Sequence, residues 1–162
     1  RYLRRHAEQL GIDPHRIVVS GSSAGGHVAV GTALLGGIDE ASDDVSVSTR
    51  PDALVLYYPV IDTSEQGYGQ KKIGARWREL SPVDHVTAGL PPTIIFHGTA
   101  DTVTPYAGAT LFQQRMKQAG NLCQLISHSG GRHGYFIFDL DLYHQAMART
   151  RDFLEAQHMI DQ

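Results

Sequence analysis

The stretch that decides the fold is VVSGSSAGGHVA, from Val18 to Ala29. An apolar run typical of a buried strand meets a cluster of glycines and serines, and a segment rich in small residues follows. Within the cluster, GSSAG at residues 21–25 fits the pattern G-x-S-x-G. A nucleophile elbow requires this order of strand, sharp turn and helix, because the turn lifts the central serine above the sheet. Ser23 occupies the central position and is the candidate nucleophile, with a solvated serine in a glycine-rich turn as the alternative.

Short apolar runs alternate with helical patterns along the rest of the chain, which predicts a mostly parallel α/β sheet with flanking helices. The predicted strands are 16–20, 53–58, 93–97 and 122–127, and the predicted helices are 1–10, 24–35, 81–86, 104–119 and 140–157. Thr104 is expected to cap the fourth of these helices. Residues 38–51 are expected to form a polar loop. Residues 59–80 are expected to form an irregular excursion that serves as a cap or pocket wall, since loops of that length are often functional.

Composition narrows the class of protein. The chain has 162 residues, 41% of them hydrophobic, which suits one globular domain with a real core. The net charge is -3 and no run of Lys or Arg exceeds a pair, so a nucleic-acid partner is not expected. The single cysteine, Cys123, excludes an internal disulfide, and no apolar stretch is long enough to span a membrane. The nine histidines are scattered, so neither a metal nor a cofactor is expected, and the compartment stays unassigned between cytoplasmic and secreted.

Two later strand ends supply the partners that a serine nucleophile needs. Asp101 lies in HGTADTVTP, after the third predicted strand, and His133 lies in SGGRHGYF, after the fourth. Functional groups gather at the carboxyl ends of parallel strands, so Ser23, Asp101 and His133 are expected to meet. Their chain order is that of α/β-hydrolases. Asp62, after the second strand, is the alternative acid, and a capping aspartate and a solvated loop histidine are the alternative roles for Asp101 and His133.

Two further histidines lie near these segments. His97 ends the third predicted strand and is expected to be structural or to support the site from behind. His27 follows the elbow and is expected to be a packed or exposed helix residue, although it lies close enough in sequence to touch the edge of the site.

With these residues in hand, the chain resembles the α/β-hydrolase superfamily, and within it the esterase and lipase branch. That branch includes hormone-sensitive-lipase-like carboxylesterases and acetyl-xylan or feruloyl esterase-like proteins. The matching segments are GSSAGGHVA, ALVLYYPVID, LSPVDHV, LPPTIIFHGTADTVTP and HGYF, spread over nearly the whole chain. The resemblance implies that Ser23 is the nucleophile, Asp101 the acid and His133 the base, and that the Ala24 N–H is one oxyanion donor.

One family feature has no counterpart ahead of Ser23. The HGG-type motif, which supplies further oxyanion N–H groups in the family, does not precede the elbow. The resemblance therefore implies that residues 1–162 form a single α/β-hydrolase domain that lacks its amino-terminal strands. Because the upstream neighbour of strand 16–20 would then be missing, this edge is expected to pair with a second copy and give a homo-oligomer.

The expected function is hydrolysis of short-chain or acetylated-carbohydrate esters through an acyl-enzyme. One alternative is a prolyl-oligopeptidase-like serine peptidase, although such enzymes usually place an aromatic residue where this chain has Ala24. The other alternative is an inert fragment that needs its missing half. Tyr58, Trp77 and Tyr135 are the candidates for the substrate pocket, and packing beneath the loop is the alternative role for them.

Overall fold

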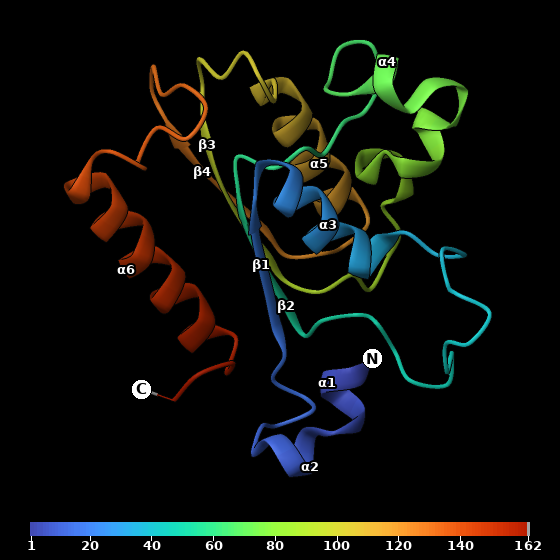
Figure 1. Cartoon of the computed structure of the whole chain (residues 1–162). Helices are drawn as coiled ribbons and strands as arrows, with labels where there is room; N and C mark the ends of the chain where they lie inside the picture. Colours follow the sequence, from blue (N-terminus) through green and yellow to red (C-terminus); the bar gives the residue numbers. More distant parts are fainter. Residues whose placement is uncertain (162) are drawn as a thin grey trace.

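A sheet of four parallel strands runs through the middle of the computed structural model, which describes residues 1–161 (Figure 1). The strands lie side by side in chain order and are β1 (Val18–Ser22), β2 (Ala53–Tyr57), β3 (Thr93–Gly98) and β4 (Cys123–His128). The last residues of β1 and β2, Ser22 and Tyr57, are register partners, and so are the last residues of β3 and β4. The expected parallel α/β fold is confirmed, and the segments that follow the strands meet along one edge of the sheet.

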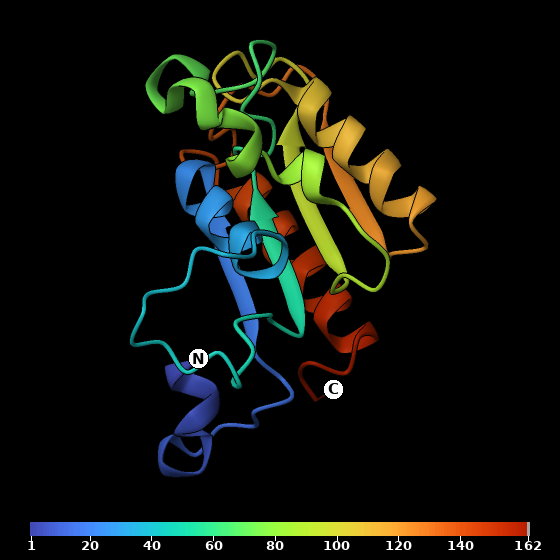
Figure 2. The same ribbon diagram turned by 90° about the vertical axis from the view of Figure 1, so that its right-hand side faces the viewer.

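Three long helices cover the two faces of this sheet. They are α3 (Ser23–Leu34), α5 (Tyr106–Gln118) and α6 (Leu140–Ala156). Helices α3 and α5 lie on one face and α6 lies on the other, as Figures 1 and 2 show from two directions. Val30 and Phe112 fill the first core against Leu54, whereas Phe153 packs in the second core with Val55. None of the helices within residues 1–161 combines the length and the hydropathy needed to cross a bilayer.

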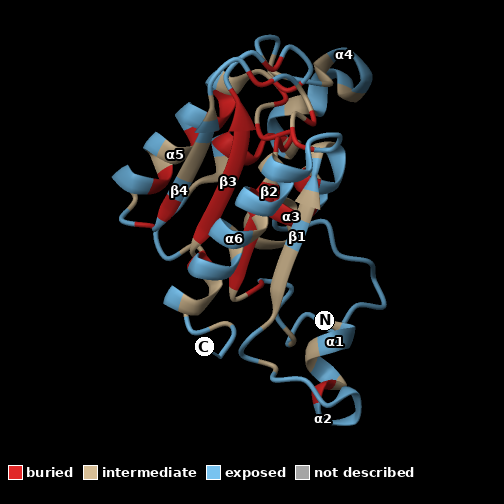
Figure 3. Cartoon of the chain, turned by 90° about the vertical axis from the view of Figure 1, so that its left-hand side faces the viewer, coloured by how far each residue is buried: buried red, intermediate tan, exposed pale blue. Residues whose placement is uncertain are grey.

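Burial differs strongly between the central strands and the first strand. Every residue of β3 is buried, and so is β2 except its last residue, whereas β1 is half-buried or exposed along its whole length (Figure 3). Within the described residues β1 has a strand partner on one side only, which is β2. The continuous apolar runs thus mark the middle of the sheet, as expected for strands that are covered on both faces.

The first strand starts two residues later than predicted. The Asp52 carboxylate accepts a hydrogen bond from the Ile17 N–H at 2.9 Å, so the ladder begins only at Val18. At the other end the ladder continues through Gly21 and Ser22. The strand therefore delivers the chain directly into the GSSAG turn.

The predicted first helix is wrong in its continuity. It is divided into α1 (Tyr2–Arg5) and α2 (Ala7–Leu10) at His6. The His6 ring stacks on Tyr2 and its Nδ1 lies 2.9 Å from the Tyr2 carbonyl oxygen. The Tyr2 carbonyl also accepts the helical hydrogen bond from the His6 N–H at 3.0 Å, so this bond is kept. The helix breaks because the His6 backbone, at φ -104° and ψ 20°, leaves the α-helical range.

The excursion from residue 59 to residue 80 is also more ordered than predicted. It contains α4 (Gln70–Ile73) and the 3-10 helix η1 (Gly74–Leu80), and η2 (Pro82–His85) follows. Gly69 and Gly74 both have positive φ and bound the single turn of α4. These helices are too short to give a periodic pattern of apolar residues in the sequence.

Candidate active site

The GSSAG turn holds Ser23 in a strained conformation. Ser23 follows β1 directly and has a φ of 52°, in the left-handed region that side chains other than glycine rarely adopt. A Cβ on Gly21 would lie 2.3 Å from the Gly25 carbonyl oxygen, and one on Gly26 would lie 2.7 Å from the Pro59 Cβ. A Cβ on Gly25 would meet nothing within 4 Å. The absence of a side chain at Gly21 and Gly26 therefore allows neighbouring backbone to approach closely and the turn to form. A nucleophile elbow needs this arrangement.

The three residues that the strand ends predicted lie in one hydrogen-bonded line. The Nε2 atom of His133 lies 2.9 Å from the Ser23 hydroxyl oxygen, and its Nδ1 atom lies 2.8 Å from the Asp101 Oδ2 atom. This is the order of nucleophile, base and orienting acid. Asp62, the alternative acid, instead accepts a hydrogen bond from the Ser64 N–H at 2.8 Å.

Asp101 is a buried carboxylate with several donors. Its Oδ1 atom accepts hydrogen bonds from the Val103 and Thr104 N–H groups, at 2.8 and 2.9 Å. Burial on its own would raise the pKa of Asp101, but the hydrogen bonds from His133, Thr104 and Val103 outweigh it and hold the pKa below its ordinary value. The carboxylate is therefore ionised at neutral pH and able to stabilise a positive charge on His133.

Thr104 has a different role from the one that the sequence predicted. Helix α5 begins two residues later, at Tyr106, with Pro105 as its N-cap. The Thr104 hydroxyl instead lies 2.9 Å from Asp101 Oδ2, 3.1 Å from His133 Nδ1 and 3.2 Å from the Tyr58 carbonyl oxygen. Asp101-x-x-Thr104 at a strand end is a usable signal for this contact, because an aspartate commonly accepts hydrogen bonds from residues two and three positions on.

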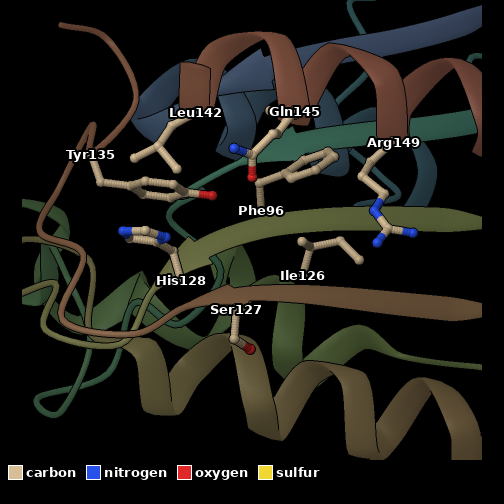
Figure 4. A pocket seen from close by; sticks show the side chains of 9 residues that line it. Phe96, Ile126, Ser127, His128, Tyr135, Leu142, Gln145 and Arg149 are labelled. Carbon is tan, nitrogen blue, oxygen red and sulfur yellow. The ribbon is translucent and has the colours of Figure 1, made fainter. Parts of the chain in front are cut away.

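The candidate pocket aromatics lie in three different places. Tyr58 is buried, and its ring meets the His133 ring edge-on with centroids 4.8 Å apart. Trp77 lies under the Arg78 guanidinium at 5.0 Å. Tyr135 stacks on His128 at 4.6 Å and lines a cavity of about 170 Å³ between α6 and strands β3 and β4 (Figure 4). Tyr58 thus packs against the His133 ring.

A second cavity, of about 140 Å³, lies beside the elbow. Its lining includes Ala24 and His27 from α3 and residues of the 59–80 excursion, namely Val60, Thr63, Tyr68 and Ile73. The Nε2 atom of His27 also lies 2.6 Å from the Leu80 carbonyl oxygen, which ties α3 to the excursion. Ala24, His27 and Val60 belong to segments that the sequence analysis singled out, whereas Thr63, Tyr68 and Ile73 carry no sequence motif.

The start of α3 offers an N–H group beside this cavity. Ala24 is in the first turn of the helix, where backbone N–H groups have no acceptor within the helix. The positive end of the helix dipole lies at the same place. A developing oxyanion on a carbonyl held at Ser23 would therefore find a donor there. Among residues 1–161, no group of three or more His, Cys, Asp or Glu side chains is placed to hold a metal ion.

Comparison with known proteins gives consistent results. Residues 1–116 match the BD-FAE family. The acetylxylan esterase of Xylanibacter ruminicola is 25% identical over 163 residues, which cover 91% of this chain and 32% of that protein. Esterase LipC of Mycobacterium tuberculosis is 26% identical, over 85% of this chain and 39% of that protein.

The similar solved structures are also esterases. Esterase 2 of Thermogutta terrifontis, phosphoramylated by tabun, is 37% identical with a TM-score of 0.92, over 99% of this chain and 62% of that one. The same esterase has been solved with propionate bound, at 34% identity and a TM-score of 0.88, over 100% of this chain and 63% of that one. The chain thus spans less than two thirds of the length of the solved esterase and less than half the length of these curated relatives.

Proposed function

Since the chain belongs to the BD-FAE family, within the esterase branch of the α/β-hydrolases, we propose that it cleaves carboxylic esters with Ser23 as nucleophile, His133 as base and Asp101 as orienting acid. The observation that carries this proposal is the pair of contacts at His133, 2.9 Å to Ser23 and 2.8 Å to Asp101. A related esterase is phosphoramylated by tabun, and an activated nucleophile in the shared fold would react in this way.

The reaction follows from these positions. His133 Nε2 takes the hydroxyl proton as Ser23 Oγ forms a bond to the ester carbonyl carbon, and Asp101 stabilises the imidazolium. The carbonyl oxygen becomes an oxyanion and accepts a hydrogen bond from the Ala24 N–H. The imidazolium returns its proton to the leaving alcohol, and the acyl group stays on Ser23. A water molecule, deprotonated by the same nitrogen, then forms a bond to the acyl carbon. The bond from that carbon to Ser23 Oγ breaks, the imidazolium returns its proton to Oγ, and the carboxylic acid leaves.

The size of the cavity beside Ala24 favours ester substrates with a short acyl group. It has about 140 Å³, and its walls are mostly apolar, from Val60, Tyr68 and Ile73. Because a water molecule occupies about 30 Å³ of liquid, the cavity suits a group of a few heavy atoms. A chain of eight carbons would have to leave it. Acetylxylan, which the name of the Xylanibacter ruminicola relative gives, carries acetyl groups of this size, so acetylated-carbohydrate esters are included in the proposed substrate class.

A chain-length series tests the substrate class. We expect p-nitrophenyl acetate and butyrate to be cleaved with a higher kcat/KM than the octanoate, and no cleavage of a prolyl-peptide substrate. Ile73→Trp, which narrows the cavity, should lower kcat/KM for the butyrate more than for the acetate. Lys71→Trp on the exposed side of α4 is the matched control. Equal losses for both esters would contradict the assignment of this cavity, and prolyl-peptide cleavage alone would favour the peptidase.

The free edge of β1 supports a further element of the proposal. Val18 and Val19 are half-buried, and the strand offers unpaired backbone groups on one side within the described chain. Such an edge pairs readily with another strand. We expect light scattering to detect homo-oligomers. Ser20→Pro should convert them to monomers, because proline removes a donor from the middle of the edge. Monomers in the unchanged chain would contradict this part of the proposal.

A further inference from the structure

His97 is a second imidazole that contacts the acid of the triad. It lies near the end of β3, and its side chain is 1% exposed. Its Nε2 atom lies 2.8 Å from the Thr104 carbonyl oxygen and 3.3 Å from the Asp101 Oδ2 atom. The first contact is a hydrogen bond, and the second is an electrostatic contact with the same N–H.

These contacts fix the tautomer of the ring. A carbonyl oxygen can only accept, so Nε2 must carry the proton and donate it to Thr104. The other nitrogen of His97, Nδ1, then presents a lone pair, and it is the one buried side-chain nitrogen or oxygen within residues 1–161 that has no hydrogen-bond partner. Burial lowers the pKa of His97, against the opposing effects of the Thr104 carbonyl and the Asp101 charge. His97 is therefore a neutral donor at neutral pH.

The titratable groups around His97 come from three elements. Asp101 lies in the loop after β3, His133 lies in the loop after β4, and Tyr106 of α5 meets the ring of His97 edge-on at 5.8 Å. None of them is within hydrogen-bond distance of Nδ1. The polar function of the ring is thus confined to Nε2.

Thr104 connects this donor to the triad. Its N–H binds Oδ1 of Asp101 and its hydroxyl lies 2.9 Å from Oδ2, so one residue contacts both carboxylate oxygens. His97 holds the carbonyl of that same residue. A displacement of Thr104 would therefore rotate the carboxylate away from Nδ1 of His133.

We propose that His97 is a positioning residue for the triad: its Nε2–H anchors the Thr104 carbonyl and so aims the Asp101 carboxylate at Nδ1 of His133. The effect on turnover rests on the proposed function, whereas the effect on the contact between His133 and Asp101 does not. Since His97 lines neither cavity, its loss should lower kcat and leave KM unchanged. Outer hydrogen-bond partners of this kind typically change activity by about ten- to hundredfold.

Two isosteric amides separate this role from simple packing. In His97→Gln the amide nitrogen is as many bonds from the backbone as Nε2 and can reach the Thr104 carbonyl, whereas in His97→Asn it falls one bond short. His85 provides the matched control, because its Nε2 lies 2.9 Å from the Arg78 carbonyl oxygen, away from the triad. The measurements are kcat and KM on p-nitrophenyl acetate and the low-field proton resonance of the His133 Nδ1–H group.

The proposal expects His97→Asn to lower kcat by about ten- to hundredfold with KM within about twofold, and to shift or broaden the low-field resonance. His97→Gln should retain most of the kcat and of the low-field resonance, and His85→Asn should change neither quantity. If His97→Asn does not fold, His97→Phe, which fills the same space without a donor, replaces it under the same criteria. A folded variant with unchanged kcat and an unchanged resonance would overturn the proposal. If Ser23→Ala kept full activity, the proposed function would be wrong. The low-field resonance in the His97 variants would still test whether His97 positions Asp101 against His133.

Discussion

The elbow and the acid loop place their proposed catalytic groups by different physical means. At the elbow, Ser23 is held by backbone geometry: its φ is positive, and Gly21 and Gly26 leave no room for a side chain. In the acid loop, Asp101 is held by hydrogen bonds from Val103, Thr104 and His133. The elbow should therefore be sensitive to added volume, whereas the acid loop should be sensitive to the loss of donors and acceptors.

The largest effect is expected in the acid loop, from Asp101→Asn. The shape of the side chain is kept, but the amide cannot stabilise an imidazolium and favours the wrong histidine tautomer, so kcat should fall by about 10⁴-fold. Steady-state hydrolysis of p-nitrophenyl acetate measures this. Asp62→Asn, at the alternative acid, is the control. A large loss at Asp62 together with a small one at Asp101 would contradict the assignment of the acid.

The elbow should respond to a single methyl group. We expect Gly21→Ala to destabilise the protein by about 3 kcal/mol, because a Cβ there would lie 2.3 Å from a backbone oxygen and the backbone itself would have to shift. Gly25→Ala should be nearly neutral, since its Cβ would meet nothing within 4 Å. Urea unfolding of both variants measures the difference. Equal stabilities would show that the turn relaxes and that backbone contact does not hold Ser23.

A smaller effect is expected from Thr104→Val, which keeps the shape of the side chain and removes its hydroxyl. The Asp101 Oδ2 atom loses one of its donors, at 2.9 Å. The expected loss is about tenfold in kcat, close to the value of one hydrogen bond to a charged group, about 1.5 kcal/mol or more. Thr104→Ser should retain the activity. If valine and serine gave the same kcat, the hydroxyl would play no part in holding the acid.

The smallest expected effect is a pH dependence of stability. The pKa of Asp101 is below its ordinary value in the folded state. As the pH falls past about 3.9, the unfolded chain therefore binds more protons than the folded chain does. The stability that the carboxylate contributes is present above that pH and is lost as the pH falls toward the folded-state pKa. The difference in unfolding free energy between the unchanged protein and Asp101→Asn should thus be constant above about pH 5 and shrink below about pH 4. A difference that grows toward acid pH would mean that the pKa is raised instead.

The sequence predicted which residues follow the strand ends and lie near one another, and it missed the hydrogen bonds that Thr104 makes to Asp101. Ser23, Asp101 and His133 each follow an apolar run, so a parallel sheet was enough to bring them near one another. In the sequence Thr104 has the features of an ordinary helix cap. A threonine that caps a helix and one that binds a carboxylate both use the side-chain hydroxyl, so the residue type does not distinguish the two roles.

Local backbone angles and side-chain contacts account for the remaining features that the sequence did not predict. Tyr58 stays a predicted pocket residue, and its positive φ and its contact with His133, which the sequence did not predict, depend on how β2 ends against the other strands. The break at His6 comes from a local change of backbone angles, which the periodicity of apolar residues does not register. Such features depend on distances between atoms, which the spacing of residue types does not determine.

The central claim is that Ser23 is the nucleophile, and covalent labelling tests it most directly. The unchanged protein is treated with a fluorophosphonate probe beside Ser23→Ala, with Ser22→Ala and Ser20→Ala as neighbouring controls, and the labelled peptide is identified by mass spectrometry. We expect one label, on Ser23, which disappears in Ser23→Ala and persists in both controls. A label that survives Ser23→Ala, or no label on the folded unchanged protein, would contradict the claim.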